Sequence, residues 1–158
     1  MKLLITGSAG FIGYHLAKKL LDCNYEICGI DNLNDYYSQK LKTNRLDLLR
    51  SYDNFKFINA DICDMESLKK EFSIHDPEKV VNLAAQPGVR YSLVNPYAYM
   101  NSNLIGFLNI LEMCKENNIK GLIYASSSSV YGDNKSKPFN IKDRVNKPIS
   151  LYGATKRA

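Results

Sequence analysis

Apolar residues are spaced along this chain in two different patterns. Short apolar runs predict five β-strands, at residues 2–6, 25–30, 55–60, 80–85 and 121–126. Longer stretches with apolar residues three or four positions apart predict four helices, at residues 11–22, 38–52, 65–73 and 96–117. Four of the five strands are nearly continuous apolar runs, as expected where helices cover both faces of a parallel sheet. The alternation therefore predicts an α/β fold with a doubly wound parallel sheet of about five strands.

The stretch after the fifth predicted strand differs from the rest. Residues 132–148 are polar and interrupted by glycine and proline, which predicts a surface loop. Residues 150–158 then begin a further helix that the sequence does not finish.

Length and composition exclude several classes of protein. The 158 residues suit one domain, with 45% hydrophobic and 23% charged residues. The net charge of +5 is spread without a block of like charge, so we expect no nucleic-acid partner. No apolar run approaches the ~20 residues of a membrane helix, and no signal peptide opens the chain, so we expect a cytoplasmic protein. Neither the cysteines nor the two histidines have metal-ligand spacing, so no metal is expected: Cys23, Cys28, Cys63, Cys114, His15 and His75.

A glycine-rich loop, TGSAGFIG, follows the first predicted strand and opens the first predicted helix. Gly7 permits a tight turn, Gly10 lets backbone approach a pyrophosphate, and Gly13 lets the helix pack closely on the strand. The N-terminal N–H groups of the helix would face the phosphates. Glycine-rich turns are common, but this position in a βαβ unit predicts a dinucleotide-binding loop in a Rossmann-type sheet.

Acidic residues end the next two strands. Asp31 stands 18 residues after Gly13, where a carboxylate accepts hydrogen bonds from the adenosine ribose. It would repel the extra phosphate of NADP, and no arginine follows immediately, so we predict NAD; the alternative is a helix-capping aspartate. Asp61 and Ile62 follow the third strand, where they would face adenine or, equally, where Asp61 would serve as a cap.

Tyr152 and Lys156 are four positions apart, so on a helix they share one face. A free tyrosine has a pKa near ~10 and is almost wholly protonated at neutral pH. A nearby ammonium and a positive nicotinamide ring favour the phenolate, which makes a general acid/base for an alcohol. A lone YxxxK arises by chance in many helices, but behind a nucleotide-binding pattern it predicts a catalytic pair.

Four serines, Ser126 to Ser129, follow the fifth predicted strand. The carboxyl ends of the strands face the ligand crevice of a doubly wound sheet, so these hydroxyls are expected at the active site. One of them would hydrogen-bond a substrate hydroxyl beside the tyrosine. The alternative is a serine-rich strand end that makes only local turns.

Together, TGSAGFIG, Asp31, LAAQPGVRYS, ASSSSVYG and YGATK resemble the extended short-chain dehydrogenase/reductases that act on nucleotide sugars. Residues 32–46, 83–96 and 124–132 are similar to UDP-glucuronate 4-epimerases. The resemblance covers essentially the whole chain, with the motifs in matching order.

The resemblance implies site residues position by position. It implies a catalytic triad of Ser127, Tyr152 and Lys156. The positions that match cofactor contacts are Gly7, Gly10, Phe11, Ile12, Gly13, Asp31, Asn32, Asp61, Ile62, Leu83, Ala84, Ala85, Gln86, Asn103, Tyr152 and Lys156. Candidate substrate contacts are Gln86, Arg90, Ser127, Ser128 and Ser129, of which Arg90, Ser128 and Ser129 would meet a sugar carboxylate.

The implied activity is NAD-dependent epimerisation of a UDP-sugar at its fourth carbon, from UDP-glucuronate to UDP-galacturonate, in polysaccharide biosynthesis. Tyr152 would take the proton of the fourth hydroxyl while hydride passes to NAD. The 4-keto sugar would then turn over and receive the hydride on its opposite face, so that NAD is recycled as a tightly held cofactor. Family dimers pair through the long helix at 96–117 and the tyrosine-bearing helix, which implies a homodimer for the full-length protein.

Other functions compete with this one. Sugar dehydratases resemble the chain but carry an Asp-Glu pair near Ser127 and Ser128, and serines cannot do the proton work of eliminating water. A UDP-glucuronate decarboxylase, or a dehydrogenase that releases its product, is an alternative enzyme. A non-catalytic NAD-binding module is an alternative of another class, but the intact trio of Ser127, Tyr152 and Lys156 counts against it.

The chain also departs from the family. Asn82 stands where related chains often have histidine, and Pro87 replaces a small residue. The family continues past the YxxxK helix into a C-terminal domain that grips the nucleotide. We therefore expect residues 1–158 to be a truncated, C-terminally incomplete NAD-binding Rossmann domain without the substrate-binding domain. Alone, it is expected to have weak or no epimerase activity and an unprotected edge at its fifth strand.

Overall fold

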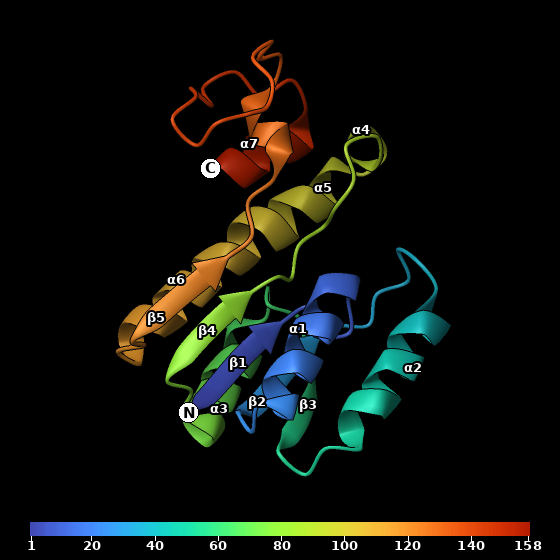
Figure 1. The fold of residues 1–158 in the computed structure, drawn as a ribbon, viewed down its shortest axis with the longest axis vertical. Coiled ribbons are helices and arrows are strands. Elements are labelled where there is room, and N and C mark those ends of the chain that lie inside the picture. The colour runs from blue at the N-terminus through green and yellow to red at the C-terminus, as the bar shows by residue number, and fades with distance from the viewer. The chain divides into compact units, whose positions relative to one another are not determined.

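The computed structural model describes all residues 1–158, and its largest element of regular structure is a five-stranded parallel sheet (Figure 1). The spatial order of the strands is β3-β2-β1-β4-β5, the order of a doubly wound sheet, so the predicted fold class is confirmed. The strands are β1 (Lys2–Thr6), β2 (Glu26–Asp31), β3 (Phe55–Asn59), β4 (Lys79–Asn82) and β5 (Gly121–Tyr124).

The helices follow the predicted pattern with three additions. The predicted helix at 96–117 is interrupted by a π-helical segment, and two short helices after β4 and β5 were not predicted. The helices are α1 (Phe11–Asp22), α2 (Gln39–Arg50), α3 (Met65–His75), α4 (Tyr91–Val94), α5 (Pro96–Tyr99), the π-helix η1 (Met100–Ile105), α6 (Gly106–Glu116), the 3-10 helix η2 (Ser128–Tyr131) and α7 (Leu151–Arg157).

The chain forms two compact units. The first unit comprises Met1–Ala84 and Gly106–Tyr124, and it contains the sheet with α1, α2, α3 and α6. The second unit comprises Ala85–Ile105 and Ala125–Ala158, and it contains α4, α5, η1, η2 and α7. The glycine loop and Asp31 therefore belong to the first unit, whereas Ser127, Tyr152 and Lys156 belong to the second.

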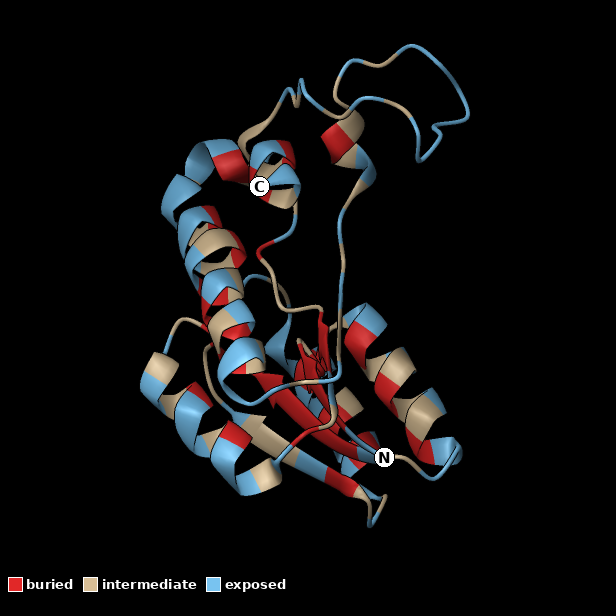
Figure 2. Cartoon of the chain, turned by 90° about the vertical axis from the view of Figure 1, so that its left-hand side faces the viewer, coloured by how far each residue is buried: buried red, intermediate tan, exposed pale blue.

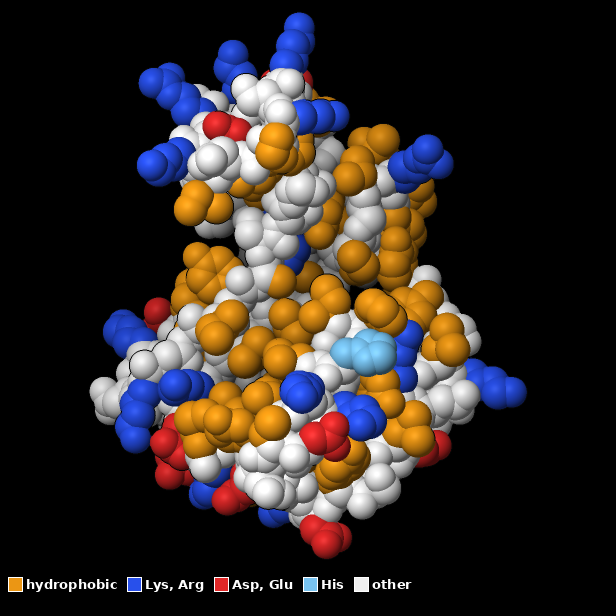
Figure 3. All heavy atoms as spheres, viewed as in Figure 1, with side chains coloured by type: hydrophobic (Ala, Val, Ile, Leu, Met, Phe, Trp, Pro, Cys, Tyr) orange, Lys and Arg blue, Asp and Glu red, His pale blue; other side chains and the backbone are white.

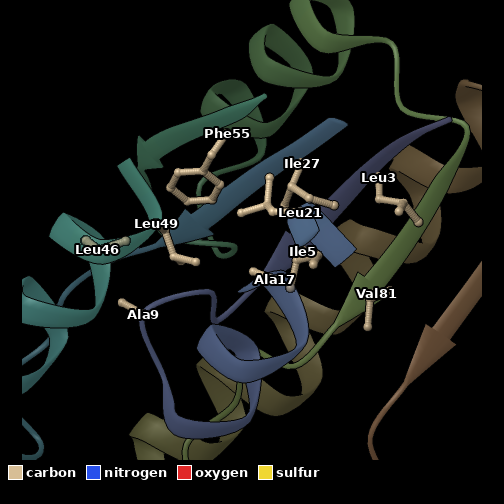
Figure 4. Close-up of a cluster of buried hydrophobic side chains, with 10 residues drawn as sticks. All are labelled: Leu3, Ile5, Ala9, Ala17, Leu21, Ile27, Leu46, Leu49, Phe55 and Val81. Carbon is tan, nitrogen blue, oxygen red and sulfur yellow. The ribbon is translucent and has the colours of Figure 1, made fainter. Parts of the chain in front are cut away.

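Both faces of the sheet carry a buried apolar cluster, because successive side chains of a strand point to opposite faces. Leu3 and Ile5 of β1 lie in the cluster that α1 and α2 cover (Figure 4). Leu4 lies in the other cluster, with side chains of α3 and α6 such as Phe72 and Met113. β1, β2 and β4 are buried along most of their length, whereas β5 at the sheet edge is not (Figure 2).

β4 ends at Asn82, although the apolar pattern predicted a strand through residue 85. The side chain of Thr6 accounts for the difference. Its Oγ1 donates to Asn82 Oδ1 at 2.6 Å and accepts the N–H groups of Leu83 and Ala84 at 3.2 and 3.0 Å. These bonds draw the backbone of residues 83–84 onto the end of β1 and out of the ladder between β4 and β5.

Basic side chains are unevenly distributed over the face in Figure 3: Lys and Arg side chains gather at one end of the view, and elsewhere Asp and Glu side chains lie among them. The loop of residues 132–148 alone carries five Lys or Arg residues against two Asp residues. None of the helices combines the length and the apolar character that crossing a membrane requires. No three His, Cys, Asp or Glu side chains lie together as ligands of a metal ion would.

Candidate functional site

Two positions of the glycine loop between β1 and α1 leave no room for a side chain, because other backbone atoms lie too close. Gly7 has a φ of +70°, and a Cβ there would lie 2.8 Å from the backbone nitrogen of Ala84. A Cβ on Gly13 would lie only 2.1 Å from the carbonyl oxygen of Gly7. The Gly10 N–H donates to that same carbonyl at 3.0 Å. The loop therefore has the tight turn and the close helix packing that a pyrophosphate-binding loop needs.

The N-terminus of α1 is open to a ligand. Its N-cap, Gly10, has no side chain to bond the first N–H groups, and no acidic residue lies in the first turn. Phe11 and Ile12, which begin the helix, are 66% and 64% exposed although both side chains are large and apolar. Free N–H groups at a helix N-terminus carry partial positive charge and favour an anion.

Asp31 is buried at the end of β2, beside the glycine loop. Its Oδ2 accepts the N–H of Ala9 at 3.1 Å, and its Oδ1 accepts the N–H of Leu33 at 2.9 Å. Because the next helix, α2, begins only at Gln39, the alternative that Asp31 caps a helix is wrong. The carboxylate lies at the carboxyl end of its strand, where a Rossmann fold presents an acid to the ribose.

Lys42 lies beside Asp31, a contact that the sequence analysis did not predict. Its side chain is buried, with Nζ 3.6 Å from Asp31 Oδ1 and 2.8 Å from Asn34 Oδ1. The sequence does contain a signal, because Lys42, Leu46 and Leu49 share the buried face of α2, where a lysine is out of place. Lys42 balances the charge of Asp31 and holds the carboxylate in position.

Asp61 bonds two segments of the first unit to each other. Its Oδ1 accepts the N–H of Cys63, and its Oδ2 accepts the amide of Asn32, both at 2.8 Å. Burial opposes ionisation, but these bonds together hold the pKa of Asp61 below its ordinary value. Asp64, and not Asp61, caps α3. Asn32 and Asp61 thus lie together at the ends of β2 and β3, with Ile62 buried next to them.

Tyr152 and Lys156 both lie in α7, which begins after Ser150. The Ser150 hydroxyl caps this helix by accepting the N–H of Gly153 at 2.9 Å. The Lys156 ammonium donates to the carbonyl oxygen of Ala125 at 3.0 Å. Burial lowers the pKa of Lys156 from its ordinary value of 10.5.

The lowered pKa of Lys156 predicts a pH dependence of stability. Between the folded pKa and 10.5, the unfolded chain binds more protons than the folded chain, so the free energy of unfolding rises with pH. We expect wild type to gain stability relative to Lys156→Met as the pH is raised from about 7 to about 10. Urea unfolding at both pH values measures this difference. The matched control is Lys19→Met, at an exposed position of α1; an identical pH response of Lys156→Met and wild type would contradict the prediction.

The serine run lies against the tyrosine-bearing helix. Ser127 is the N-cap of η2, and its Oγ accepts the N–H of Ser129 at 3.2 Å, so one serine does make a local turn. A Cβ on Gly153 would lie 2.7 Å from the carbonyl oxygen of Ser129. The backbone of η2 therefore packs directly on α7 at the residue that follows Tyr152. Ser128 is exposed and Ser129 is half-buried.

Two of the remaining predicted residues of the second unit, Gln86 and Asn103, are joined by hydrogen bonds. Asn103 Oδ1 accepts the N–H of Gln86 at 2.8 Å, and its Nδ2 donates to the carbonyl of Gln86 at 3.2 Å and to Thr155 Oγ1 at 3.0 Å. Ala85, next to Gln86, is half-buried. Arg90 is exposed at the start of α4. Thr155 was not predicted, since no local sequence pattern indicates a contact between residues so far apart.

This chain is similar to known proteins over essentially its whole length. Residues 4–158 match the family model described as GDP-mannose 4,6 dehydratase. Similar curated proteins include Protein CapI of Staphylococcus aureus, 54% identical over 100% of this chain and 47% of that protein. The probable UDP-glucuronate 4-epimerase of Rhizobium meliloti is 44% identical over 100% of this chain and 46% of that protein.

Solved structures of 4-epimerases also match this chain over nearly its whole length. The UDP-glucuronic acid 4-epimerase from Bacillus cereus, crystallised in complex with UDP-glucuronic acid and NAD, is 38% identical with a TM-score of 0.88. The match covers 99% of this chain and 49% of that one. The UDP-glucose 4-epimerase of Thermus thermophilus, crystallised with NAD, is 30% identical with a TM-score of 0.84, and the match covers 99% of this chain and 47% of that one. This chain spans about half the length of the relatives it matches.

Proposed function

The chain belongs to the GDP-mannose 4,6-dehydratase family of extended short-chain dehydrogenase/reductases, and from this premise we propose that it supplies the NAD-binding and catalytic portion of a UDP-sugar 4-epimerase. The proposed reaction interconverts UDP-glucuronate and UDP-galacturonate. Support for the reaction class comes from the relatives named as 4-epimerases, and support for the uronate comes from those named for UDP-glucuronate.

One observation carries the proposal more than any other. The ammonium of Lys156 is fixed by the carbonyl of Ala125, two residues before Ser127, and Lys156 lies one helical turn after Tyr152. A phenol, an ammonium and a hydroxyl therefore come from two segments that pack on each other within one compact unit. These three groups are suited to removing a proton from a secondary alcohol.

Each of the three side chains has a separate part in the proposed reaction. Tyr152 accepts the proton of the sugar's fourth hydroxyl and later returns it to the oxygen of the 4-keto sugar. The positive charge of Lys156 favours the phenolate form that makes this transfer efficient. Ser127 hydrogen-bonds the substrate oxygen and holds it for Tyr152.

The residues of the first unit fit NAD. Gly7 and Gly13 leave no room for a Cβ against neighbouring backbone, as expected of a pyrophosphate-binding loop. Asp31 is at the carboxyl end of β2, the position from which an acid of a Rossmann fold would accept hydrogen bonds from the ribose. When bound, NAD would accept a hydride from the fourth carbon of the sugar and give it back. Leu83 and Ala84, which bond to Thr6, would line the cofactor, as would Asn32, Asp61 and Ile62.

The serine run favours epimerisation over the dehydration in the family's name. Removing water from a 4-keto sugar needs an acidic and a basic side chain that act at neighbouring carbons of the sugar. Ser127, Ser128 and Ser129 offer only hydroxyls, whose protons are far too weakly acidic for that work. Together with Arg90, the last two instead supply hydrogen-bond donors for the carboxylate of a uronate.

Product analysis tests the proposal. Protein expressed from the complete gene is incubated with NAD and UDP-glucuronate, and the products are identified by NMR. We expect UDP-galacturonate without net accumulation of NADH, and little turnover of UDP-glucose, which lacks the carboxylate. Formation of a UDP-pentose would indicate a decarboxylase, and accumulating NADH would indicate a dehydrogenase. Bound NAD without any turnover would indicate a binding module, and each of these three outcomes contradicts the proposal.

The proposal also includes the location of the complete protein in the cell and its oligomeric state. We propose that the complete protein is a cytoplasmic homodimer. The exposed apolar side chains of Leu108 and Leu111 on α6 support pairing through this helix. Light scattering of the complete protein measures its mass in solution, and a monomer would contradict the dimer without affecting the proposed reaction.

A further inference from the structure

Tyr99 is a fully buried tyrosine that neither the motifs nor the proposed reaction accounts for. It ends α5 in the second unit, and its exposed fraction is 0%. Its hydroxyl lies 2.7 Å from the carbonyl oxygen of Pro87 and within hydrogen-bond distance of that of Gly88, so its one proton is shared between the two carbonyls. Gly88 has a φ of +98°, in the region that favours glycine, and the backbone at this point turns both carbonyls toward one hydroxyl.

The ring of Tyr99 makes a second contact, with the proposed base itself. The ring centroids of Tyr99 and Tyr152 are 6.0 Å apart, and their planes cross at 73° in an edge-to-face arrangement. Such pairs stabilise one relative orientation of two rings. The hydroxyl end of Tyr99 is therefore anchored to the 87–88 backbone, and the ring of Tyr99 contacts the ring of Tyr152.

Asn103, four residues later, makes a parallel connection. It bonds the backbone of Gln86 on one side and Thr155 on the other, and the Thr155 hydroxyl donates to the carbonyl of Tyr152 at 2.9 Å. Tyr99 and Asn103 thus both join residues 86–88 to α7. Asn103 reaches the backbone of Tyr152 through Thr155, whereas Tyr99 contacts the ring of Tyr152.

We infer that Tyr99 is a positioning residue for Tyr152, which sets the orientation of the phenol by means of a ring anchored to the 87–88 backbone. This inference rests on the proposed function, because it gives Tyr152 the part of the base. Segment 86–88 leads directly to Arg90, a candidate contact of the substrate. A single buried side chain therefore ties the position of the base to the segment expected beside the sugar.

The test uses the complete protein with NAD bound and the variant Tyr99→Phe. Phenylalanine keeps the volume of the ring but removes the hydroxyl, so the fold is retained while the ring loses its anchor. The matched control is Tyr97→Phe on the same short helix, because Tyr97 is 78% exposed. Tyr99→Met, which removes the ring but keeps much of the volume, serves as the second variant.

We expect Tyr99→Phe to lower kcat by about tenfold and to move the acid limb of the kcat–pH profile to higher pH, with a larger effect in Tyr99→Met. Both changes follow if the phenol is no longer held where the Lys156 ammonium stabilises its anion. A purely structural role would lower the active fraction equally at all pH values and leave the limb in place. Thermal unfolding of each variant establishes that the folded state is populated in the assay.

Two outcomes overturn the inference. In the first, Tyr99→Phe has the kcat and pH profile of Tyr97→Phe; in the second, kcat falls but the acid limb stays where it is in wild type. Failure of the proposed function is recognised separately, because wild type would then form no UDP-galacturonate from UDP-glucuronate; failure of Tyr152 as the base is recognised if Tyr152→Phe retains full activity. If Tyr152→Phe is inactive and Tyr99→Phe behaves as the control, only the role of Tyr99 is refuted.

Discussion

Tyr152→Phe is expected to lower kcat for UDP-glucuronate by at least about 100-fold in the complete protein. The change removes a single oxygen, and with it the group that is proposed to exchange a proton with the sugar's fourth hydroxyl. Because the ring stays, its edge-to-face contact with Tyr99 and the cap of α7 by Ser150 are retained. The measurement is initial rates of UDP-galacturonate formation, followed by chromatography.

Two controls accompany this variant. NAD binding, measured by calorimetry, should be largely retained, because the variant keeps the ring of residue 152 and leaves the glycine loop and Asp31 of the first unit unchanged. Tyr97→Phe should leave the rate unchanged, because the Tyr97 side chain lies at the surface. If Tyr152→Phe turned over substrate as fast as wild type, Tyr152 would not be the base.

Gly13→Ala is expected to destabilise the protein by about 3 kcal/mol and to weaken NAD binding more than tenfold. The added Cβ would lie 2.1 Å from the Gly7 carbonyl oxygen, a backbone atom that cannot rotate away. Relief requires α1 to move off the loop, which takes its N-terminal N–H groups away from the pyrophosphate. Urea unfolding measures the stability, and calorimetry measures NAD affinity.

A second glycine of the same unit gives the matched control. A Cβ on Gly121, in β5, would meet only side-chain atoms of Lys79 at 3.8 Å, which is ordinary contact. Gly121→Ala should therefore leave stability within about 1 kcal/mol of wild type and NAD affinity unchanged. Equal behaviour of Gly13→Ala and Gly121→Ala would show that the close packing at Gly13 has no bearing on cofactor binding.

The fold was largely predictable because the spacing of apolar residues reflects which positions of each element are buried. β1 and α1 begin and end at the residues that the pattern indicates, since β1 is the central strand of the sheet and α1 packs on one of the sheet's faces. The pattern failed at the end of β4, where the residues remain apolar but the hydroxyl of Thr6 takes their N–H groups. It also missed the π-helical segment and η2, since turn chemistry and hydrogen bonding decide these short elements.

The candidate site was predictable only where a local motif encodes it. Glycine spacing, an acid after a strand and YxxxK can all be read within a few residues. Lys42 was not predicted because the charged partner that permits its burial, Asp31, lies in another element. Tyr99 and Thr155 escaped because their roles depend on contacts across dozens of positions, with Tyr152 and with Asn103. Such contacts exist only once the chain has folded.

The central claim is that Tyr152 acts as a base beside the bound nicotinamide. A crystal structure of the complete protein with NAD and UDP-glucuronate tests it most directly. The account predicts the Tyr152 hydroxyl within about 3 Å of the sugar's fourth oxygen, with the nicotinamide ring facing the fourth carbon. The account is contradicted if residues 125–132 and 152–156 are well ordered and the Tyr152 oxygen nevertheless lies away from both the sugar and the nicotinamide.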